Sequence, residues 1–407
     1  MAETTVSYNP FEPGFIEDPY AEYAKMRRED PIHRSPLGFW VLFGYEDITR
    51  FLKDPTLSVE DRNATPTALD QMVMEILADR AESDRGARSM LSRDPPDHTR
   101  LRKLVTKAFT PRVIQNLRPR IQELVDEMLD EARERRGMDV ISDFAFPLPF
   151  IVISEMLGVP AKDGQKLREW SGMIVRSLEP IVDPDTVRRI VDASDKMFDH
   201  VSDLIAWKRK EPGDDLLSAL IAAEEHGDVL SDDELVEQVV LLYIAGHETT
   251  VNLIGNGVLA LLRNRDEMTR MRKDPALSPG AVEEMLRYDS PVQMTRRITL
   301  TDVEIGGKTI EKGAFCALVL AAANRDPDHF GLDAEMLDIG REQAHQHLSF
   351  GGGAHYCLGA ALARLEGEVA IGSLVNRFPD IDFAGEPAYN GRLNLRGLET
   401  FPVSLGT

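Results

Sequence analysis

The chain is 407 residues long and strongly acidic, with a formal net charge of −22 and 43% hydrophobic residues. That length can bury a large core, whereas the charge repels phosphate backbones and anionic lipid, so we expect no nucleic-acid partner. Two cysteines cannot form a disulfide framework, which indicates a reducing, cytoplasmic location. The N-terminal stretch lacks a signal-peptide pattern, and the longest apolar runs are too short to cross a bilayer, so we expect no membrane insertion.

Helical periodicity dominates the chain, and strand signals are few and short. Apolar residues recur at helical spacing over 113–136 and 186–210, and each segment predicts one amphipathic helix. Strands are expected within 38–43 and 298–320, where the second stretch turns at Gly306-Gly307 and predicts a hairpin. Neither a repeat nor a linker is visible. We therefore expect one mainly α domain with small β-sheets over residues 1–407.

The longest predicted helix begins at a capping box formed by Ser231 and Glu234 and continues to about residue 265, roughly 50 Å. Residues 239–245 are apolar all round, which indicates a buried helix. Its centre nevertheless reads AGHETT, and these polar residues are costly inside a buried helix. Two interpretations stay open: a surface turn of a partly exposed helix, or a functional site that Gly246 makes accessible.

The segment HLSFGGGAHYCLGAALARLE places Cys357 between a glycine loop and the start of a helix. A thiol there faces unpaired backbone N–H groups and the positive end of the helix dipole, which predicts a lowered pKa. Three interpretations compete: a buried structural cysteine, a zinc site with His345, His347 and His355, and a haem-thiolate ligand. The zinc spacing matches no common signature, whereas a single cysteine suffices for haem.

This segment resembles the haem-binding signature of the cytochrome P-450 superfamily, a Phe-Gly-x-Gly-x-His-x-Cys-x-Gly loop followed by a helix. Three more segments match in the family's order, namely DPPDHTRLRKLV, AGHETT and EEMLR, so the resemblance spans most of the chain. It implies the soluble bacterial branch and the cytochrome P-450 fold. That fold is a triangular helical prism with haem between the long central helix and the cysteine loop. A β-rich lobe is expected from about 1–60 plus 290–325.

The resemblance implies a haem b cofactor with Cys357 as the thiolate ligand of the iron. The haem propionates need cationic partners, and His98 and Arg102 lie four residues apart on one helix face. From spacing alone, that face is equally typical of a solvated helix surface. The implied cofactor-binding residues are Cys357, His98, Arg102, Arg297, His355, Phe350, Gly351 and Gly359.

The central helix is expected over the opposite face of the haem. There the resemblance makes Gly246 the space for dioxygen and Glu248 and Thr249 a proton relay. The implied catalytic residues are Glu248, Thr249, Ala245 and Gly246.

The EEMLR segment supplies Glu284 and Arg287, which the resemblance assigns to a structural network with Arg341. Relatives often carry Phe where this chain has Leu337, four residues before Arg341. The expected substrate contacts are Ile244, Ala245, Val292, Gln293, Met294 and Leu398.

The implied function is a haem-thiolate monooxygenase that inserts one oxygen atom from O2 into a medium-to-large apolar substrate. Two electrons would come from a ferredoxin and its reductase, because the chain has no flavin or iron–sulfur segment. The donor would dock on a basic patch of Arg100, Lys103, Lys107 and Arg112, and we expect a monomer. The alternatives are a peroxide-driven peroxygenase and a non-catalytic haem sensor. The Glu248-Thr249 pair argues against a sensor, which needs no proton relay.

Overall fold

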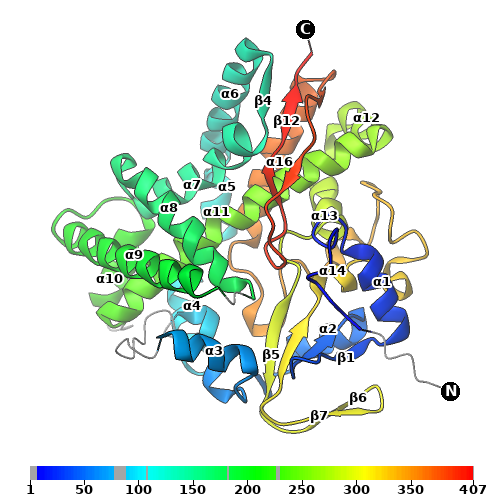
Figure 1. The fold of residues 1–407 in the computed structure, drawn as a ribbon. Coiled ribbons are helices and arrows are strands. Elements are labelled where there is room, and N and C mark those ends of the chain that lie inside the picture. The colour runs from blue at the N-terminus through cyan, green and yellow to red at the C-terminus, as the bar shows by residue number, and fades with distance from the viewer. Residues whose placement is uncertain (1–6, 78–88, 107–108, 181–182, 226–229, 407) are drawn as a thin grey trace.

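The computed structural model describes residues 7–77, 89–106, 109–180, 183–225 and 230–406 (Figure 1). Helices dominate it, as the periodicity predicted. The α-helices are α1 Tyr20–Glu29, α2 Tyr45–Lys53, α3 Ala68–Leu77, α4 Asp97–Thr106, α5 Pro111–Asn116, α6 Arg118–Arg135, α7 Pro147–Leu157, α8 Gly164–Ile174, α9 Pro184–Lys210, α10 Leu216–Glu225, α11 Asp232–Arg263, α12 Arg265–Lys273, α13 Ser278–Tyr288, α14 Leu320–Ala323, α15 Pro327–Phe330 and α16 Ala360–Arg377.

The largest sheet joins two distant parts of the chain. It has five strands in the order β1-β2-β8-β5-β3, with β2 parallel to β8 and the other neighbours antiparallel. Smaller sheets are β4-β12-β9, β10-β11 and β6-β7. The strands are β1 Ile32–Arg34, β2 Trp40–Leu42, β3 Leu57–Ser58, β4 Gly137–Asp139, β5 Thr295–Thr299, β6 Val303–Ile305, β7 Lys308–Ile310, β8 Phe315–Leu318, β9 Asp382–Phe383, β10 Ala388–Tyr389, β11 Leu398–Thr400 and β12 Pro402–Ser404.

The hairpin prediction is confirmed. Strands β6 and β7 pair in antiparallel register, with Ile305 opposite Lys308. Gly306 and Gly307 form the connection with φ of 54° and 73°. Positive φ at both turn positions is what a two-residue hairpin requires, and glycine adopts it without steric cost.

The central helix prediction is also confirmed. Helix α11 runs for 32 residues, and the side chain of Ser231 and that of Glu234 each cap the other's backbone N–H. It crosses the middle of the molecule, with α8, α9 and α10 toward one end and α16 beside it (Figure 1). Its buried apolar residues from Val251 onward join those of α6, α13 and α16 in the largest hydrophobic core, and those from Leu235 to Tyr243 lie in a second core. Because α11 is mainly apolar and central, the neighbouring helices pack against it.

The expectation of one helix over 113–136 is wrong. Helix α5 ends at Asn116 and α6 begins at Arg118, with Pro119 in its first turn. Proline lacks a backbone N–H and fits only the first turn of a helix, so the periodic stretch splits there. The apolar stripe is cut as well, because Val113 is 40% exposed while Ile121 is fully buried. The second segment does form one helix, α9.

None of the helices in the described part of the chain combines the length and hydrophobicity that spanning a membrane requires.

Candidate active site

The glycine loop folds back on itself and places Cys357 beside the start of α16. The Gly351 N–H donates to the Leu348 carbonyl at 2.7 Å, and the Cys357 N–H donates to the Phe350 carbonyl at 2.9 Å. Gly351 and Gly353 have φ of 68° and 64°, which only glycine adopts readily. Gly359 is the N-cap of α16, two residues after the cysteine.

Glycine is required in this loop for close packing against α2. A Cβ at Gly353 would lie 2.3 Å from the Leu52 carbonyl oxygen. One at Gly352 would lie 3.2 Å from the Leu52 side chain. Gly359 differs, because its φ is −81° and a Cβ there would lie 4.0 Å from the Cys357 sulfur.

The predicted lowering of the Cys357 pKa is wrong for this geometry. Cys357 is exposed to solvent in this structure, yet the protein atoms packed around it desolvate the thiolate and raise its pKa. The backbone N–H groups of Gly359 and Ala360 and the charges of Arg102 and Arg364 lower the pKa by less. Desolvation by the surrounding protein atoms therefore affects this pKa more than the helix terminus does. This sulfur needs a further cation to be held as a thiolate.

Cys316 is an internal comparison. It packs fully buried in β8, as expected, and burial raises its pKa to about 12. Cys316 has no cationic group among the causes of its shift, whereas two arginines act on Cys357. Only Cys357 therefore has the electrostatic surroundings of an anionic ligand.

The histidines of the zinc interpretation do not converge on Cys357. Nowhere in the described ranges do three or more His, Cys, Asp or Glu side chains gather as a metal site would require. The His347 ring contacts the Glu283 carboxylate at 3.1 Å, and the His345 ring contacts the Glu342 carbonyl at 3.0 Å. Each ring is thus engaged in a local contact.

Four basic side chains gather near the cysteine loop from three separate elements. They come from α4, β5 and the loop itself: His98, Arg102, Arg297 and His355. The rings of His98 and His355 lie 4.1 Å apart, and Arg102 donates to the Tyr356 carbonyl at 2.6 Å. Arg297 is buried and bonds the carbonyls of Arg296 and Leu52 at 2.7 and 3.2 Å.

All four groups have lowered pKa values, and burial is the largest cause in each. Burial, then His98, Arg297 and Arg102, lower the pKa of His355 to about 3. Burial lowers the pKa of Arg297 to about 10, and Asp94 offsets only part of that effect. His98 is 2% exposed, and neither ring nitrogen has a hydrogen-bond partner among the described residues. A cluster of this kind is electrostatically complementary to an anion that bears several acceptor oxygens.

Opposite them, the AGHETT segment occupies the centre of α11. His247 is fully buried and Thr250 is 2% exposed, so the interpretation of a surface turn does not hold. Ala245 is exposed although its helix is mostly buried. A Cβ at Gly246 would lie 3.1 Å from Ile153 of α7, so close helix packing also favours glycine there. The glycine lets α7 approach, and Ala245 is the small residue on the open side.

The acid and the threonine of this segment have defined partners. The Thr249 hydroxyl donates to the Ala245 carbonyl at 3.1 Å. The Glu248 carboxylate forms a short ion pair with Arg392, and its second oxygen lies 3.9 Å from the His247 ring. Burial lowers the pKa of His247, so this ring is held neutral beside the acid. Arg392 was missed by the sequence, because 144 residues separate it from Glu248.

The structure brings Glu284, Arg287 and Arg341 together. Arg287 and Glu284 are both fully buried and share two hydrogen bonds of 2.7 and 2.8 Å. Arg287 also donates to the carbonyls of Asn324, Ala334 and Met336, between 2.7 and 3.0 Å. The Arg341 Nε lies 3.3 Å from Glu284 despite the leucine at 337. The pair therefore ties α13 to the segment before the cysteine loop.

The expected substrate contacts differ in how accessible they are. Gln293 is fully buried, its amide donates to the Ser290 carbonyl at 2.7 Å, and its oxygen accepts from Tyr23 at 3.2 Å. It is thus engaged inside the protein, and Leu398, at 3% exposed, packs in the largest core. Partly exposed positions are Ile244, Ala245, Val292 and Met294.

Glu366 on α16 ends the segment that resembles the haem-binding signature. It is 1% exposed, and neither carboxylate oxygen has a hydrogen-bond partner among the described residues. Burial raises its pKa well above the ordinary value, although the nearby Thr250 hydroxyl lowers it somewhat. Glu366 lies four residues after Leu362, so the sequence places both on the core-facing side of the helix. The sequence does not show that the carboxylate lacks a partner there.

The comparisons with known proteins agree with this fold. The family model described as "Cytochrome P450" matches residues 39–380. The chain is 44% identical over 404 residues to "Cytochrome P450 107B1" of Saccharopolyspora erythraea, with 97% of each chain covered. It is 43% identical over 417 residues to "Vitamin D(3) 25-hydroxylase" of Pseudonocardia autotrophica, covering 100% of this chain and 99% of that one. The chain therefore belongs to the cytochrome P450 family.

Solved structures lead to the same conclusion. The fold superposes with a TM-score of 0.89 on the myxobacterial cytochrome P450 CYP267B1, whose structure contains myristic acid. The two chains are 40% identical, and the match covers 98% of this chain and 99% of the other. By this membership the chain is a monooxygenase of a haem-binding family.

Proposed function

We propose that Cys357 binds the iron of haem b and that His98, Arg102, Arg297 and His355 hold its two propionates. The observation that supports this most is the His98 ring, which is buried with two unpartnered nitrogens among three other basic groups. Two carboxylates would raise the depressed pKa values of these groups and give the ring acceptors. Bound haem supplies the activation of dioxygen, and a thiolate ligand favours O–O cleavage.

The chain's own residues would then bind, shield and deliver protons. Phe350 packs at the edge of the largest core and limits water on the cysteine side, with the Arg364 guanidinium 4.6 Å from its ring centre. Glu248 and Thr249 would pass protons to the distal side, where the small Ala245 leaves space for substrate. The alternatives of a peroxygenase or a sensor make no use of this acid–threonine pair.

We infer a medium-to-large, mainly apolar substrate that is hydroxylated or epoxidised. The partly exposed side chains at Ile244, Val292 and Met294 support an apolar lining. One similar protein is named for its action on vitamin D3, and another was solved with myristic acid. Both compounds are predominantly apolar. The sequence proposes five regions that line the pocket: 62–92, 170–197, the central helix around 244–245, 292–295 and 398–401. Within the first two, 78–88 and 181–182 lie outside the described residues.

The cysteine assignment is tested by a substitution of each cysteine. Cys357→Ala should lose the red-shifted Soret band that a thiolate ligand produces in the reduced carbon monoxide complex. Cys316→Ala should keep it, because that thiol is fully buried in β8. Loss of the band in Cys316→Ala, or its persistence in Cys357→Ala, would contradict the proposal.

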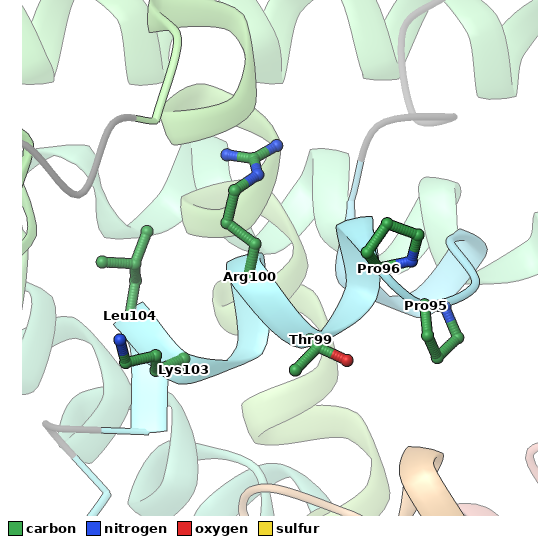
Figure 2. A pocket seen from close by; sticks show the side chains of 6 residues that line it. All are labelled: Pro95, Pro96, Thr99, Arg100, Lys103 and Leu104. Atoms are coloured by element: carbon green, nitrogen blue, oxygen red, sulfur yellow. The ribbon is translucent and has the colours of Figure 1, made fainter.

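We further propose that an acidic ferredoxin delivers the electrons to the α4 side of the molecule. A hollow of about 590 Å3 lies there, and Figure 2 shows the side chains that line it: Pro95, Pro96, Thr99, Arg100, Lys103 and Leu104. His98 and Arg102 are not part of the lining, so the hollow faces away from the four basic groups. Arg100 is paired with Glu234 at 2.5 Å, which leaves Lys103 and Arg112 as the exposed charges that support docking, and Lys107 lies outside the described residues.

Reversal of one charge tests this docking. Lys103→Glu should slow reduction by an acidic ferredoxin several-fold at low ionic strength, and the difference should shrink in high salt because salt screens steering. Lys196→Glu on α9 makes the same charge change elsewhere and should have no such effect. Equal rates for wild type and Lys103→Glu at low salt would exclude this surface. Cytoplasmic location, a monomeric state and a single domain over 1–407 stay predictions.

A further inference from the structure

The turn over residues 390–397, which we name the strap, contacts the central helix at three points. Arg392 forms the ion pair with Glu248. The Leu395 carbonyl accepts from the Asn252 amide at 3.3 Å, and the Arg396 carbonyl accepts from the Asn256 amide at 3.1 Å. At Gly397 a Cβ would lie 1.9 Å from the Asn252 oxygen, so the strap lies directly on α11. Its position therefore determines where the Arg392 guanidinium meets the acid.

The other side of the strap holds a carboxylate from a distant loop. Glu179 follows the short 3-10 helix Val175–Leu178, between α8 and α9. Its two oxygens accept from three successive backbone N–H groups: Leu393 at 2.8 Å, Asn394 at 3.0 and 3.2 Å, and Leu395 at 3.1 Å. Consecutive N–H groups that converge on an anion form a strong, directional site. Glu179 is partly buried there, so water competes with these bonds only weakly.

Beside Glu179, the strap is held at Arg396, which pairs with Asp289 and donates to the carbonyls of Ile16 and Glu17 at 3.0 Å, and at Leu395, which forms an isolated β-bridge with Val292. The Asn394 carbonyl accepts from the Gln293 N–H at 2.8 Å, and its side-chain oxygen accepts from the Met294 N–H at 3.2 Å. Among the described residues, no acceptor besides Glu179 is found for the N–H groups of Leu393, Asn394 and Leu395. Removal of the carboxylate would leave all three donors unpaired at once. Unpaired donors are costly, so the strap would move to reach water.

We propose that Glu179 and Arg392 are positioning residues that act in series on Glu248. Glu179 holds the strap, the strap holds Arg392, and Arg392 orients the Glu248 carboxylate for proton transfer. The geometry of the acid is thereby coupled to the docking of the α8–α9 loop. This inference rests on the proposed role of Glu248 in proton delivery.

The first test measures the coupling without relying on activity. Hydrogen exchange of the purified holoprotein should show the amides of 393–395 exchanging about tenfold or more faster in Glu179→Ala, because bonds to a charged acceptor protect strongly. Glu179→Gln keeps one acceptor oxygen and should fall between that variant and wild type. Glu169→Ala replaces an exposed glutamate on the neighbouring α8 and should leave these amides unchanged.

The second test measures the effect on Glu248. With an artificial ferredoxin and reductase and no added substrate, the fraction of consumed dioxygen released as hydrogen peroxide should rise in Arg392→Met and in Glu179→Ala. The double variant should match Arg392→Met, since both changes act through one contact. Arg392→Lys retains the charge and should restore part of the wild-type value.

The outcomes separate this inference from the proposed function. If Glu179→Ala speeds exchange but leaves the peroxide fraction unchanged, or if the two substitutions add, Glu179 is only a structural anchor and the inference is wrong. If Glu248→Gln itself leaves the peroxide fraction unchanged, the relay is wrong, and this inference fails with it.

Discussion

Individual residues in this site derive their chemistry from neighbours rather than from local sequence. Cys357 stands at a helix start, which by itself favours a thiolate, yet burial raises its pKa. His98 lies on a helix face that spacing alone makes ordinary, yet its ring is buried and unpartnered. Glu248 belongs to the AGHETT motif, but its carboxylate is paired with Arg392, which lies far away in the sequence. In each residue, desolvation and through-space charge outweigh the contribution of adjacent residues.

The proposed relay of Glu248 and Thr249 can be tested by single substitutions. Thr249→Ala should still consume dioxygen but release more of it as hydrogen peroxide, because the hydroxyl proposed to pass the proton is gone. Glu248→Gln should slow turnover by roughly tenfold or more, as loss of a general acid commonly does. In the wild-type protein the Thr249 hydroxyl donates to the Ala245 carbonyl at 3.1 Å. Thr249→Ser keeps this hydroxyl, so its peroxide release should stay close to that of wild type. Unchanged peroxide release in Thr249→Ala would argue against the relay.

Among the elements, the cysteine loop shows most directly how sterics build the site. Gly351 and Gly353 adopt positive φ, and the loop lies against the C-terminal end of α2 so closely that Gly353 tolerates no side chain. Helix α11 contributes the other wall, and Gly246 lets α7 pack against it. Loop and helix are thus each positioned by glycines at points of contact with a third element.

The steric argument predicts different costs for two glycines with similar φ. Gly353→Ala should lower the melting temperature and weaken haem retention, because a Cβ would lie 2.3 Å from the Leu52 oxygen. Gly391 has a φ of 72° and open space around it. Gly391→Ala should therefore lower the free energy of unfolding only by the cost of the left-handed conformation, about 1–2 kcal/mol. Thermal unfolding of both variants checks this, and equal losses would show that contact with α2 is unimportant.

For the whole molecule, a buried ion pair links the helical core to the segment that leads into the cysteine loop. Glu284 and Arg287 are fully buried, and Arg287 satisfies three backbone carbonyls between Asn324 and Met336. A buried charge without its partner is far costlier than an exposed one. The network therefore specifies how α13 and this segment fit together.

Breaking the buried pair should be much more damaging than breaking a surface pair. Arg287→Met leaves Glu284 without its bidentate partner and should cost about 3–5 kcal/mol. Arg270→Met removes a 2.8 Å pair with Glu267 in which the arginine is 48% exposed, and it should cost about 0–1 kcal/mol. Melting temperatures of the two variants provide the comparison. Similar shifts for both would mean that burial does not make this pair special.

The sequence by itself determined those features that depend on short stretches of chain. The capping box of α11, the Gly306-Gly307 hairpin and the glycine loop before Cys357 are local, because their hydrogen bonds and φ values involve neighbouring residues. The mainly α class followed from periodicity in the same way. Periodicity alone was not sufficient for the helix boundaries. The apolar spacing over 113–136 is continuous, but Pro119 divides the stretch into two helices.

Only the tertiary structure decided how distant residues act on one another. It placed Arg392 against Glu248, the Glu179 carboxylate on the strap, and Gln293 in an internal network with Tyr23. It also reversed the expected pKa shift of Cys357. These outcomes depend on burial and on charges many residues away in the chain, and a linear pattern carries neither quantity.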